Sequence, residues 1–263
     1  MKTVLVTGAA GGMGYATAKR LIKKGCRVIG LDIAPTCDLP DYYPCDLTKE
    51  DAIAAVFASV AEKQEKIDAI LHFAGIYRMG SLVEMEEEKL LSIFSINLFG
   101  VYRVNRIFLP LLEKGGRILI TSSELAPLWP LPFTGLYGIT KAALEKYAFS
   151  LAMELNLLGI GVSVLRPGAV KTPLIDVTTS EIDALCEKTK LYRANTRRFK
   201  RITDSVKGRN VSPEAVAKLA ERILFAKHPR FLYSINRNPL LIFLSLLPKR
   251  LQLFIIKTIL KTK

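Results

Sequence analysis

A glycine-rich turn near the start of the chain limits the possible folds more than any other feature. Thr3–Thr7 is a short apolar run rich in β-branched residues, and it leads directly into a turn that contains Gly8, Gly12 and Gly14. An alanine-rich amphipathic stretch follows and ends at Gly25. A strand, a tight turn, a helix and a glycine C-cap in this order predict the first βα unit of a layered α/β fold.

The rest of the chain repeats this alternation. Further strands are expected at Arg27–Asp32, Tyr42–Cys45, Ile67–Ala74, Gly116–Thr121, Gly161–Arg166 and Phe231–Ile235, and helices at Thr48 to about Glu65, Glu86 to Leu112 and Tyr137–Leu158. Strands that alternate with helices form a parallel sheet covered on both faces. We therefore predict a single doubly wound α/β (Rossmann) domain over residues 1–235, followed by a helical tail over residues 236–263.

The glycine turn and the end of the second strand together indicate a dinucleotide site. Glycines let the backbone approach a pyrophosphate, and the helix N-terminus donates hydrogen bonds to that anion. Asp32 ends the second strand, 18 residues after Gly14, and no Lys or Arg lies within Gly8–Gly14 or Ile33–Thr36. A carboxylate at this place accepts hydrogen bonds from ribose hydroxyls and repels a 2′-phosphate. NAD is therefore expected in preference to NADP.

Three residues carry the predicted chemistry: Ser123, Tyr137 and Lys141. Tyr and Lys four positions apart share one face of a helix, so the ammonium group can favour the ionised phenol. An unperturbed tyrosine has a pKa of about 10, too high for proton exchange near neutral pH without such a cation. A Tyr and Lys pair alone is common on helix surfaces. Its position after the glycine turn, Asp32 and a strand that ends in serines favours a hydride-transfer site, in which Ser123 holds the substrate oxygen.

With these motifs, the chain resembles the short-chain dehydrogenase/reductase family from Lys2 to Phe231. The resemblance implies that Asn97, Ser123, Tyr137 and Lys141 are catalytic, with Asn97 holding a water of a proton relay and Lys141 also binding the nicotinamide ribose. The resemblance also places Asp46 at the adenine and Thr172 at the nicotinamide amide. The full set of implied cofactor contacts is Gly8, Gly12, Met13, Gly14, Asp32, Asp46, Leu47, Ala74, Gly75, Tyr137, Lys141, Pro167, Gly168, Val170 and Thr172.

Two positions depart from the family pattern. Phe73 stands where the family usually has an Asn that ties neighbouring strands, and we expect this change to alter local stability more than chemistry. Glu124 is unusual beside Ser123, and the sequence leaves open whether it faces the substrate.

The expected activity is the NAD-dependent interconversion of a secondary alcohol and a ketone. Leu125–Phe133 is apolar, contains the only Trp and lies where the family places a substrate wall. A hydrophobic substrate, such as a steroid, bile acid, retinoid or fatty-acyl compound, is expected, and packing under the sheet is the alternative role of these side chains. Arg117–Ser123 and Leu131–Lys141 are similar to hydroxysteroid dehydrogenases. A catalytically silent NAD-sensing regulator or membrane-associated scaffold of the same fold is the alternative function.

The C-terminal third of the chain is strongly basic. From Glu187 to Lys263 there are 19 Lys and Arg against four acids, a net charge of +15, which leaves −1 for residues 1–186. Many of these bases lie in the expected substrate lid, Leu174–Arg209, where they fit either an acidic group on the substrate or a solvated face. No nucleic-acid module accompanies them, so nucleic acid is not an expected partner.

The tail is expected to form two short helices. Asn238 and Pro239 open the first, and Leu251–Lys263 has the pattern of a basic amphipathic helix, with Arg250, Lys257 and Lys261 opposite Ile255 and Ile259. Each apolar piece is shorter than the roughly 20 residues that cross a bilayer. The sequence leaves three roles open for the tail: contact with an anionic membrane surface, a cover over the substrate pocket, or a subunit interface.

Other classes of site are not expected. Cys26, Cys37, Cys45 and Cys186 show no Cys-x-x-Cys spacing and are accompanied by two histidines, which predicts neither a metal site nor a disulfide framework. A serine hydrolase is excluded by the lack of a Gly-x-Ser-x-Gly motif. The first apolar run begins at Thr3, so no signal peptide is expected, and we predict a cytoplasmic homo-oligomer that acts on a small molecule.

Overall fold

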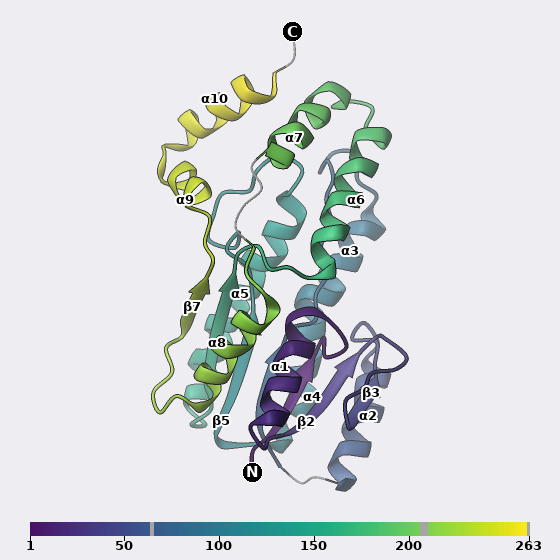
Figure 1. The fold of residues 1–263 in the computed structure, drawn as a ribbon, viewed down its shortest axis with the longest axis vertical. Helices are drawn as coiled ribbons and strands as arrows, with labels where there is room; N and C mark the ends of the chain where they lie inside the picture. Colours follow the sequence, from purple (N-terminus) through teal and green to yellow (C-terminus); the bar gives the residue numbers. More distant parts are fainter. Residues whose placement is uncertain (64–65, 206–209, 262–263) are drawn as a thin grey trace.

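The computed structural model describes residues 1–63, 66–205 and 210–261, and it is built on one parallel sheet. Within these residues the strand order is β3-β2-β1-β4-β5-β6-β7, and each neighbouring pair is parallel. This order confirms the doubly wound sheet, with its reversal between β1 and β4 (Figure 1). The strands are β1 (Thr3–Thr7), β2 (Arg27–Asp32), β3 (Asp41–Pro44), β4 (Ile67–His72), β5 (Leu112–Thr121), β6 (Gly161–Pro167) and β7 (Leu232–Ile235).

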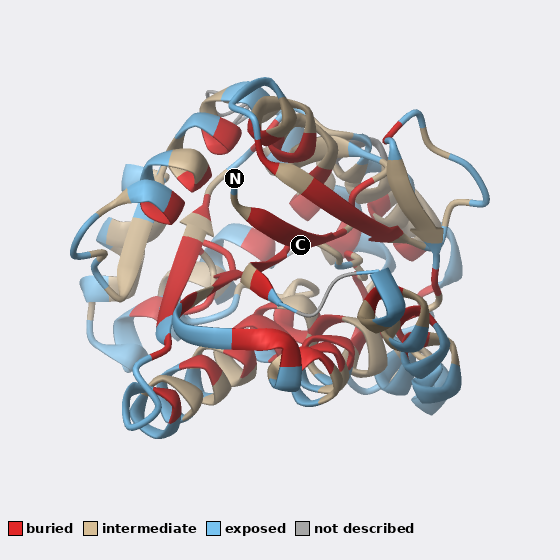
Figure 2. Ribbon diagram, turned by 90° about the horizontal axis from the view of Figure 1, so that it is seen from below, coloured by how far each residue is buried: buried red, intermediate tan, exposed pale blue. Residues whose placement is uncertain are grey.

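Helices cover both faces of the sheet. The helices are α1 (Gly12–Lys23), α2 (Glu50–Lys63), α3 (Glu87–Phe94), α4 (Val101–Phe108), α5 (Gly135–Asn156), α6 (Pro173–Lys188), α7 (Arg193–Ser205), α8 (Pro213–Phe225), α9 (Pro239–Leu246) and α10 (Lys249–Leu260). Side chains alternate along β1, so Val4 and Val6 pack with α1 and α8, whereas Leu5 packs with α2, α4 and α5. The strands are therefore buried on both sides, as Figure 2 shows.

Several predicted boundaries differ from the structure, most of them by one or two residues. The segment expected as one helix from Glu86 to Leu112 is divided by a π-helical turn at Ser95–Gly100 and ends in a 3₁₀ turn at Leu109–Leu111. β5 begins at Leu112 rather than at Gly116, because Leu112 pairs with Ile67 before a register shift. β4 ends at His72, two residues before the predicted end, because the chain leaves the sheet at Phe73. The predicted end of the second helix near Glu65 lies outside the described residues.

Four helices cover the edge of the sheet where the strands end. α6 and α7 form the region expected as a lid, and α9 and α10 form the tail (Figure 1). α10 packs on α7, where the Asn195 side chain donates to the carbonyl of Leu260 at 2.8 Å and Arg198 donates to the carbonyl of Lys261 at 2.9 Å. The tail therefore packs over the end of the molecule that carries the predicted site residues.

The buried face of α10 differs from the predicted one. Gln252 and Leu260 are buried, and Ile256 packs against the apolar cluster that contains Phe199, whereas Ile259 is exposed. The helix is turned because Leu260 joins the apolar cluster around Phe199 of α7. The described part of the chain contains no helix that is both long and apolar enough to cross a membrane.

Candidate active site

The turn after β1 has a conformation that requires glycine. Gly8 and Gly12 have positive φ angles of 70° and 51°. A Cβ atom at Gly14 would overlap the carbonyl oxygen of Gly8, so the start of α1 lies directly against the turn. The result is a helix N-terminus open to the space beyond the carboxyl end of β1.

A cleft of about 340 Å³ lies at this helix N-terminus, and we call it the glycine cleft. Ten of the residues that the sequence predicts as cofactor contacts line it: Gly8, Gly12, Met13, Gly14, Asp32, Asp46, Leu47, Ala74, Gly75 and Thr172. They come from the ends of β1, β2, β3 and β4 and from the segment before α6. A parallel sheet brings them together because all its strands end at one edge.

Asp32 lies beside the glycine turn. Its Oδ2 accepts a hydrogen bond from the backbone N–H of Ala10 at 3.0 Å, and its Oδ1 accepts one from Ala34 at 3.2 Å. The carboxylate is thereby held at the edge of the glycine cleft with further lone pairs available. Among the described residues that line this cleft there is no Lys or Arg. A negative charge without a cationic neighbour disfavours a 2′-phosphate at this place.

A second cavity of about 680 Å³ adjoins the glycine cleft, and we call it the tyrosine cavity. Ser123, Tyr137 and Lys141 line it, as do the predicted contacts Pro167, Gly168 and Val170. Met13, Gly75 and Thr172 line both spaces, which are therefore continuous. The structure thus brings the glycine turn, the acidic strand end and the serine, tyrosine and lysine to one edge of the sheet.

Tyr137 is partly buried at the start of α5. Burial raises the pKa of its phenol to about 12, and a hydrogen bond with the Ser123 hydroxyl opposes that rise. Ser123 is itself buried and follows β5, so the two hydroxyls meet where the strand and helix converge. The neutral phenol is the stable form in this environment.

Lys141 does not lower the pKa of Tyr137 in this structure, contrary to the expectation from the sequence. Its ammonium nitrogen lies 5.7 Å from the centre of the Tyr137 ring and donates to the backbone carbonyl of Thr121 at 3.0 Å. The cation therefore faces the ring and the end of β5 rather than the hydroxyl. Burial lowers the pKa of Lys141 itself to about 8, with Glu145 opposing the shift.

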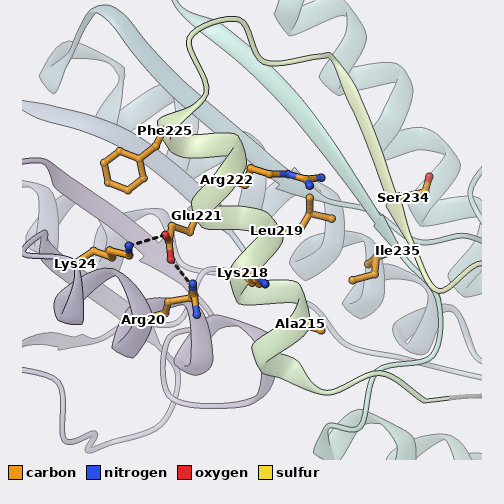
Figure 3. Close-up of a pocket in the computed structure, with 10 residues that line it drawn as sticks. All are labelled: Arg20, Lys24, Ala215, Lys218, Leu219, Glu221, Arg222, Phe225, Ser234 and Ile235. Atoms are coloured by element: carbon orange, nitrogen blue, oxygen red, sulfur yellow. Dashed lines mark ion pairs between the residues drawn. The ribbon is translucent and has the colours of Figure 1, made fainter.

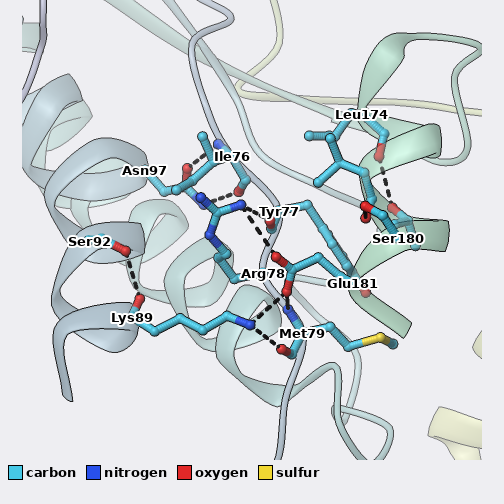
Figure 4. Close-up of polar contacts among 12 residues, drawn as sticks. Ile76, Tyr77, Arg78, Met79, Lys89, Ser92, Asn97, Leu174, Ser180 and Glu181 are labelled. Carbon is cyan, nitrogen blue, oxygen red and sulfur yellow. Dashed lines mark hydrogen bonds and ion pairs between the residues drawn. The ribbon is translucent and has the colours of Figure 1, made fainter. Parts of the chain in front are cut away.

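Asn97 occupies the π-helical turn between α3 and α4. Its Oδ1 accepts from the backbone N–H of Ile76 at 2.8 Å, and its Nδ2 donates to the Ile76 carbonyl at 3.0 Å (Figure 4). The same Nδ2 donates to the Thr140 hydroxyl at 3.2 Å. The side chain thus holds the segment that follows β4 against α5. A role for Asn97 in a proton relay stays a prediction.

The sequence did not single out Tyr77, which the structure places against the catalytic candidate. The Tyr77 and Tyr137 rings are 4.8 Å apart and tilted by 49°. Burial raises the pKa of Tyr77 as well, so this second phenol stays neutral. The one available signal was its position, three residues after Ala74 at the carboxyl end of β4.

Phe73 faces the functional space, and the expectation that it alters local stability more than chemistry stays a prediction. Its side chain lines both the glycine cleft and the tyrosine cavity. Its backbone N–H donates to the Thr7 carbonyl at 3.1 Å, which keeps β4 beside β1 without the side chain of an Asn. Phe73 therefore contributes an apolar wall where the two spaces join.

Glu124 answers the question that the sequence left open. It lines the tyrosine cavity and is almost fully buried, and burial raises the pKa of its carboxyl group. Its Oε2 accepts the backbone N–H of Asn238 at 2.6 Å, and its own N–H donates to the Pro167 carbonyl at 2.9 Å. The residue next to Ser123 therefore holds the residue that caps the start of α9.

The expected substrate wall is divided between two roles. Leu125 and Leu131 line the tyrosine cavity. Trp129 lies more than half exposed outside it, with the Lys249 ammonium group 4.1 Å from the ring centre. Phe133 packs its ring against Tyr192 and Phe199 of the cover. Part of the predicted wall thus supports the lid rather than the substrate space.

The structure gives no support for an anionic substrate. The lid contributes Leu174, Ile182 and Phe199 to the tyrosine cavity, together with threonines and Asp204. Among the described lid residues, no Lys or Arg lines this space, because these side chains lie on the outer surface of α6 and α7. The predicted bases Lys207 and Arg209 lie outside the described residues.

Glu181 fastens the lid to the rest of the molecule. Its carboxylate accepts from Lys89 at 2.7 Å, from the backbone N–H of Met79 at 3.0 Å and from Arg78 at 3.5 Å (Figure 4). These partners lie on α3 and on the segment after β4. One side chain of α6 therefore connects the lid to both walls beneath it.

A separate basic groove lies between α1 and α8. Glu221 forms ion pairs with Arg20 and with Lys24, the latter at 3.4 Å, and Lys218 and Arg222 line the same hollow (Figure 3). The groove shares no lining residue with the tyrosine cavity. Within the described residues, no cluster of His, Cys, Asp and Glu has the arrangement of a metal site.

Comparison with known proteins places these features in a family. The family model of short chain dehydrogenases matches residues 2–183. The chain is 33% identical to oxidoreductase UcpA of Escherichia coli over 188 residues, which are 66% of this chain and 72% of that protein. It is also 33% identical over 187 residues to mouse estradiol 17-beta-dehydrogenase 2, covering 65% of this chain and about half, 49%, of that protein.

A solved structure shows the same fold. The 3-ketoacyl-(acyl-carrier-protein) reductase of Brucella melitensis, complexed with NADH, superimposes with a TM-score of 0.72 at 23% identity. The match covers 89% of this chain and 96% of that one.

Proposed function

The chain belongs to the short-chain dehydrogenase family, and we propose that it is an NAD-dependent oxidoreductase that interconverts a secondary alcohol and a ketone on a hydrophobic substrate. One observation carries this proposal. Ser123, Tyr137 and Lys141 line a cavity that is continuous with a glycine cleft bordered by Asp32. Hydride transfer needs a nicotinamide ring and a proton-transfer group next to one substrate carbon, and this continuity supplies the room for both.

The residues have separate tasks in the proposed reaction. The nicotinamide cofactor accepts or supplies the hydride. Ser123 holds the substrate oxygen, and Tyr137 exchanges a proton with it. The raised pKa of Tyr137 keeps the phenol protonated, ready to give its proton to the oxygen of a ketone under reduction. In the reverse direction Tyr137 accepts the proton of the alcohol in its phenolate form, and Lys141 would bind the nicotinamide ribose beside it.

The preference for NAD follows from the glycine cleft. The N–H groups at the start of α1 and the glycine turn would hold a pyrophosphate, and Asp32 would accept hydrogen bonds from the adenosine ribose. The lack of a Lys or Arg among the described lining residues supports NAD over NADP.

The tyrosine cavity supports an apolar substrate of moderate size. Its volume of about 680 Å³ is within the range of pockets that enclose drug-sized molecules. Phe73, Leu125, Leu131 and Ile182 give it apolar walls around the polar group of Ser123 and Tyr137. A steroid, bile acid, retinoid or similar lipid alcohol fits this description. The estradiol named for the mouse relative is a compound of this type.

The test is turnover by the purified full chain. With NAD and a panel of hydroxysteroids, retinol and long-chain secondary alcohols, at least one substrate should produce NADH, and Ser123→Ala should remove most of the rate. A matched control is Ser122→Ala, because Ser122 precedes the candidate serine and its hydroxyl donates to the backbone of Lys141. NAD binding without turnover of any panel member would instead support the catalytically silent regulator or scaffold.

Homo-oligomerisation and a cytoplasmic location are part of the proposal. The π-helical turn, α4 and α5 carry exposed apolar side chains, Phe99, Tyr102, Phe149 and Met153 among them, and exposed apolar patches commonly mark contact surfaces. All four cysteines are free thiols, as is usual in a reducing compartment. Sedimentation of Phe149→Glu should show dissociation relative to the unmodified chain.

A further inference from the structure

The first tail helix has apolar side chains on both sides. On the inner side, Leu241 lines the tyrosine cavity, and Leu241 and Leu244 line a small hollow under the tail. On the outer side, Phe243 is 64% exposed and Leu246 is 78% exposed. A water-facing helix normally places polar residues on its outer side. The outer side of α9 therefore has the composition of a covered surface.

The second tail helix continues this surface. Leu253 is 72% exposed and Phe254 is 65% exposed, whereas the preceding residue, Gln252, is buried. Figure 1 shows α9 and α10 joined end to end at the far end of the molecule, above the carboxyl ends of the strands. We call the exposed apolar residues of these helices the tail face; its members are Leu240, Phe243, Leu246, Leu251, Leu253, Phe254 and Ile259.

The charged residues of the tail sequence are all of one sign. No Asp or Glu occurs from Arg222 to Lys263, whereas nine Lys and Arg do. Four of these bases, Lys249, Arg250, Lys257 and Lys261, are exposed on α10 or directly after it. Apolar side chains bordered by Lys and Arg match the boundary of an anionic bilayer, where acyl chains lie beneath negative headgroups.

Other occupants fit less well. α9 and α10 have 8 and 12 residues, too few to cross a bilayer. A second copy packed on the same face by two-fold symmetry would bring these bases against their own counterparts, with no acid in the tail to pair with them. An anionic lipid surface satisfies both the apolar and the cationic residues.

We propose that the tail face docks on the surface of an anionic lipid bilayer. Phe243, Leu246, Leu253 and Phe254 lie at the boundary between headgroups and acyl chains, and the neighbouring bases contact the headgroups. Because Leu241 lines the tyrosine cavity from the opposite side of the same helix, docking places that cavity next to the membrane. Entry of an apolar substrate from the bilayer rests on the proposed function, whereas the docking itself does not.

The experiment is flotation of the full chain with vesicles, without substrate or cofactor. We compare vesicles of phosphatidylcholine alone with vesicles that also contain phosphatidylserine. The unmodified chain should float with the anionic vesicles, less with the neutral ones, and less as salt increases. Phe243→Glu/Phe254→Glu should reduce binding to anionic vesicles about tenfold or more.

Two further variants make the result specific. Leu157→Glu/Leu158→Glu places the same two new charges on exposed leucines, 85% and 57% exposed, just after α5 and far from the tail, and should bind like the unmodified chain. Arg250→Ser/Lys257→Ser should weaken binding to anionic vesicles and leave binding to neutral vesicles unchanged. Thermal unfolding of each variant checks that it is folded.

Several results would overturn the proposal. It fails if the folded unmodified chain does not float with anionic vesicles, or if Phe243→Glu/Phe254→Glu and Leu157→Glu/Leu158→Glu bind equally well. It also fails if the double glutamate variant changes the sedimentation coefficient but not vesicle binding, because the tail face would then contact a second copy. None of these outcomes depends on turnover, so they are separate from a failure of the proposed enzyme activity.

Discussion

The glycine cleft and the helical cover over the tyrosine cavity are formed under different constraints. In the cleft, Gly8 and Gly14 are required by backbone geometry, because a Cβ atom at either would overlap main-chain atoms. In the cover, α6, α7, α9 and α10 are held by a few side chains that reach across, such as Glu181 and Asn195. The family match ends at residue 183, inside α6. Cofactor geometry thus restricts the first region, whereas the second is free to adapt to substrate and surroundings.

Charge separates the two regions in the same way. Residues 1–186 have a net charge of −1 and the remaining residues +15. Among the described residues, no Lys or Arg after residue 186 lines the tyrosine cavity. The difference teaches that the basic C-terminal third affects what the molecule contacts outside this cavity rather than the chemistry within it.

The largest effect should come from the reacting residue beneath the cover. Tyr137→Phe removes the phenol that exchanges a proton with the substrate oxygen, so kcat should fall by about 10²- to 10⁴-fold. The dissociation constant of NAD should stay within a few-fold, because the glycine cleft is unchanged. Steady-state kinetics and NAD titration measure the two quantities. Tyr77→Phe is the matched control, since it removes the neighbouring hydroxyl and keeps the ring contact. Retained turnover in Tyr137→Phe would rule out its acid and base role.

The next effect should be confined to the glycine cleft. Asp32→Ala removes the carboxylate that accepts from Ala10 and repels a 2′-phosphate, so the ratio of kcat/KM for NAD to that for NADP should fall by roughly a hundredfold. Asp38→Ala is a suitable control, because Asp38 lies in the same loop region and pairs with Lys19 outside the cleft. An unchanged cofactor ratio in Asp32→Ala would contradict the assignment of the cleft.

The two regions also differ in how far the sequence predicted them. The glycine turn, the alternation of strands and helices and the positions of Tyr137 and Lys141 follow from local patterns, since spacing along a strand or helix fixes which side chains meet. The rotation of α10 did not follow, because Leu260 is buried by contact with Phe199, sixty positions earlier in the chain. Long-range packing of this kind leaves no periodic signal in one segment.

Electrostatics at the site were predicted only in part. The sequence placed Lys141 and Tyr137 together, but the direction of the phenol pKa depends on burial and on the Thr121 carbonyl that holds the ammonium group. The sequence did not predict the roles of Tyr77 and Glu124 either. Tyr77 acts through a ring contact with Tyr137, and Glu124 acts through a hydrogen bond to the distant Asn238. Residue type and spacing identify reacting groups, whereas their surroundings need the folded chain.

The free energy of unfolding should fall in acid because of a buried histidine in the sheet. His72 lies at the end of β4, hydrogen-bonded to Asn105 at 2.8 Å, and burial lowers its pKa to about 4 from 6.5. Above pH 6.5 the histidine is neutral in both states. As the pH falls from 6.5 toward 4, the unfolded chain binds a proton that the folded chain does not, so the free energy of unfolding falls.

Between pH 7 and 5 this contribution amounts to about 2 kcal/mol. His72→Gln has no titratable group at this position. Its free energy of unfolding, measured by chemical denaturation, should therefore change less between pH 7 and 5 than that of the unmodified chain, whatever its absolute stability. His228→Gln is the control, because His228 is exposed near the start of β7. Equal slopes for His72→Gln and the unmodified chain would show that His72 does not cause the loss.

The smallest effect concerns Glu124, which connects the two regions. Glu124→Ala leaves the Asn238 N–H without its acceptor and loosens the start of α9, whose Leu241 lines the tyrosine cavity. KM for an apolar substrate should rise about tenfold, a cost typical of one lost hydrogen bond to a charged group. Glu124→Gln keeps an acceptor oxygen, so its KM should lie between that of the unmodified chain and that of Glu124→Ala. Because Ser123 and the glycine cleft are untouched, kcat and NAD affinity should change little. A fall in kcat with constant KM would contradict this prediction, because Glu124 would then act on the chemistry next to Ser123 and not on the cover. Glu124 would in that case belong to the geometrically fixed region of the molecule and not to the adaptable cover.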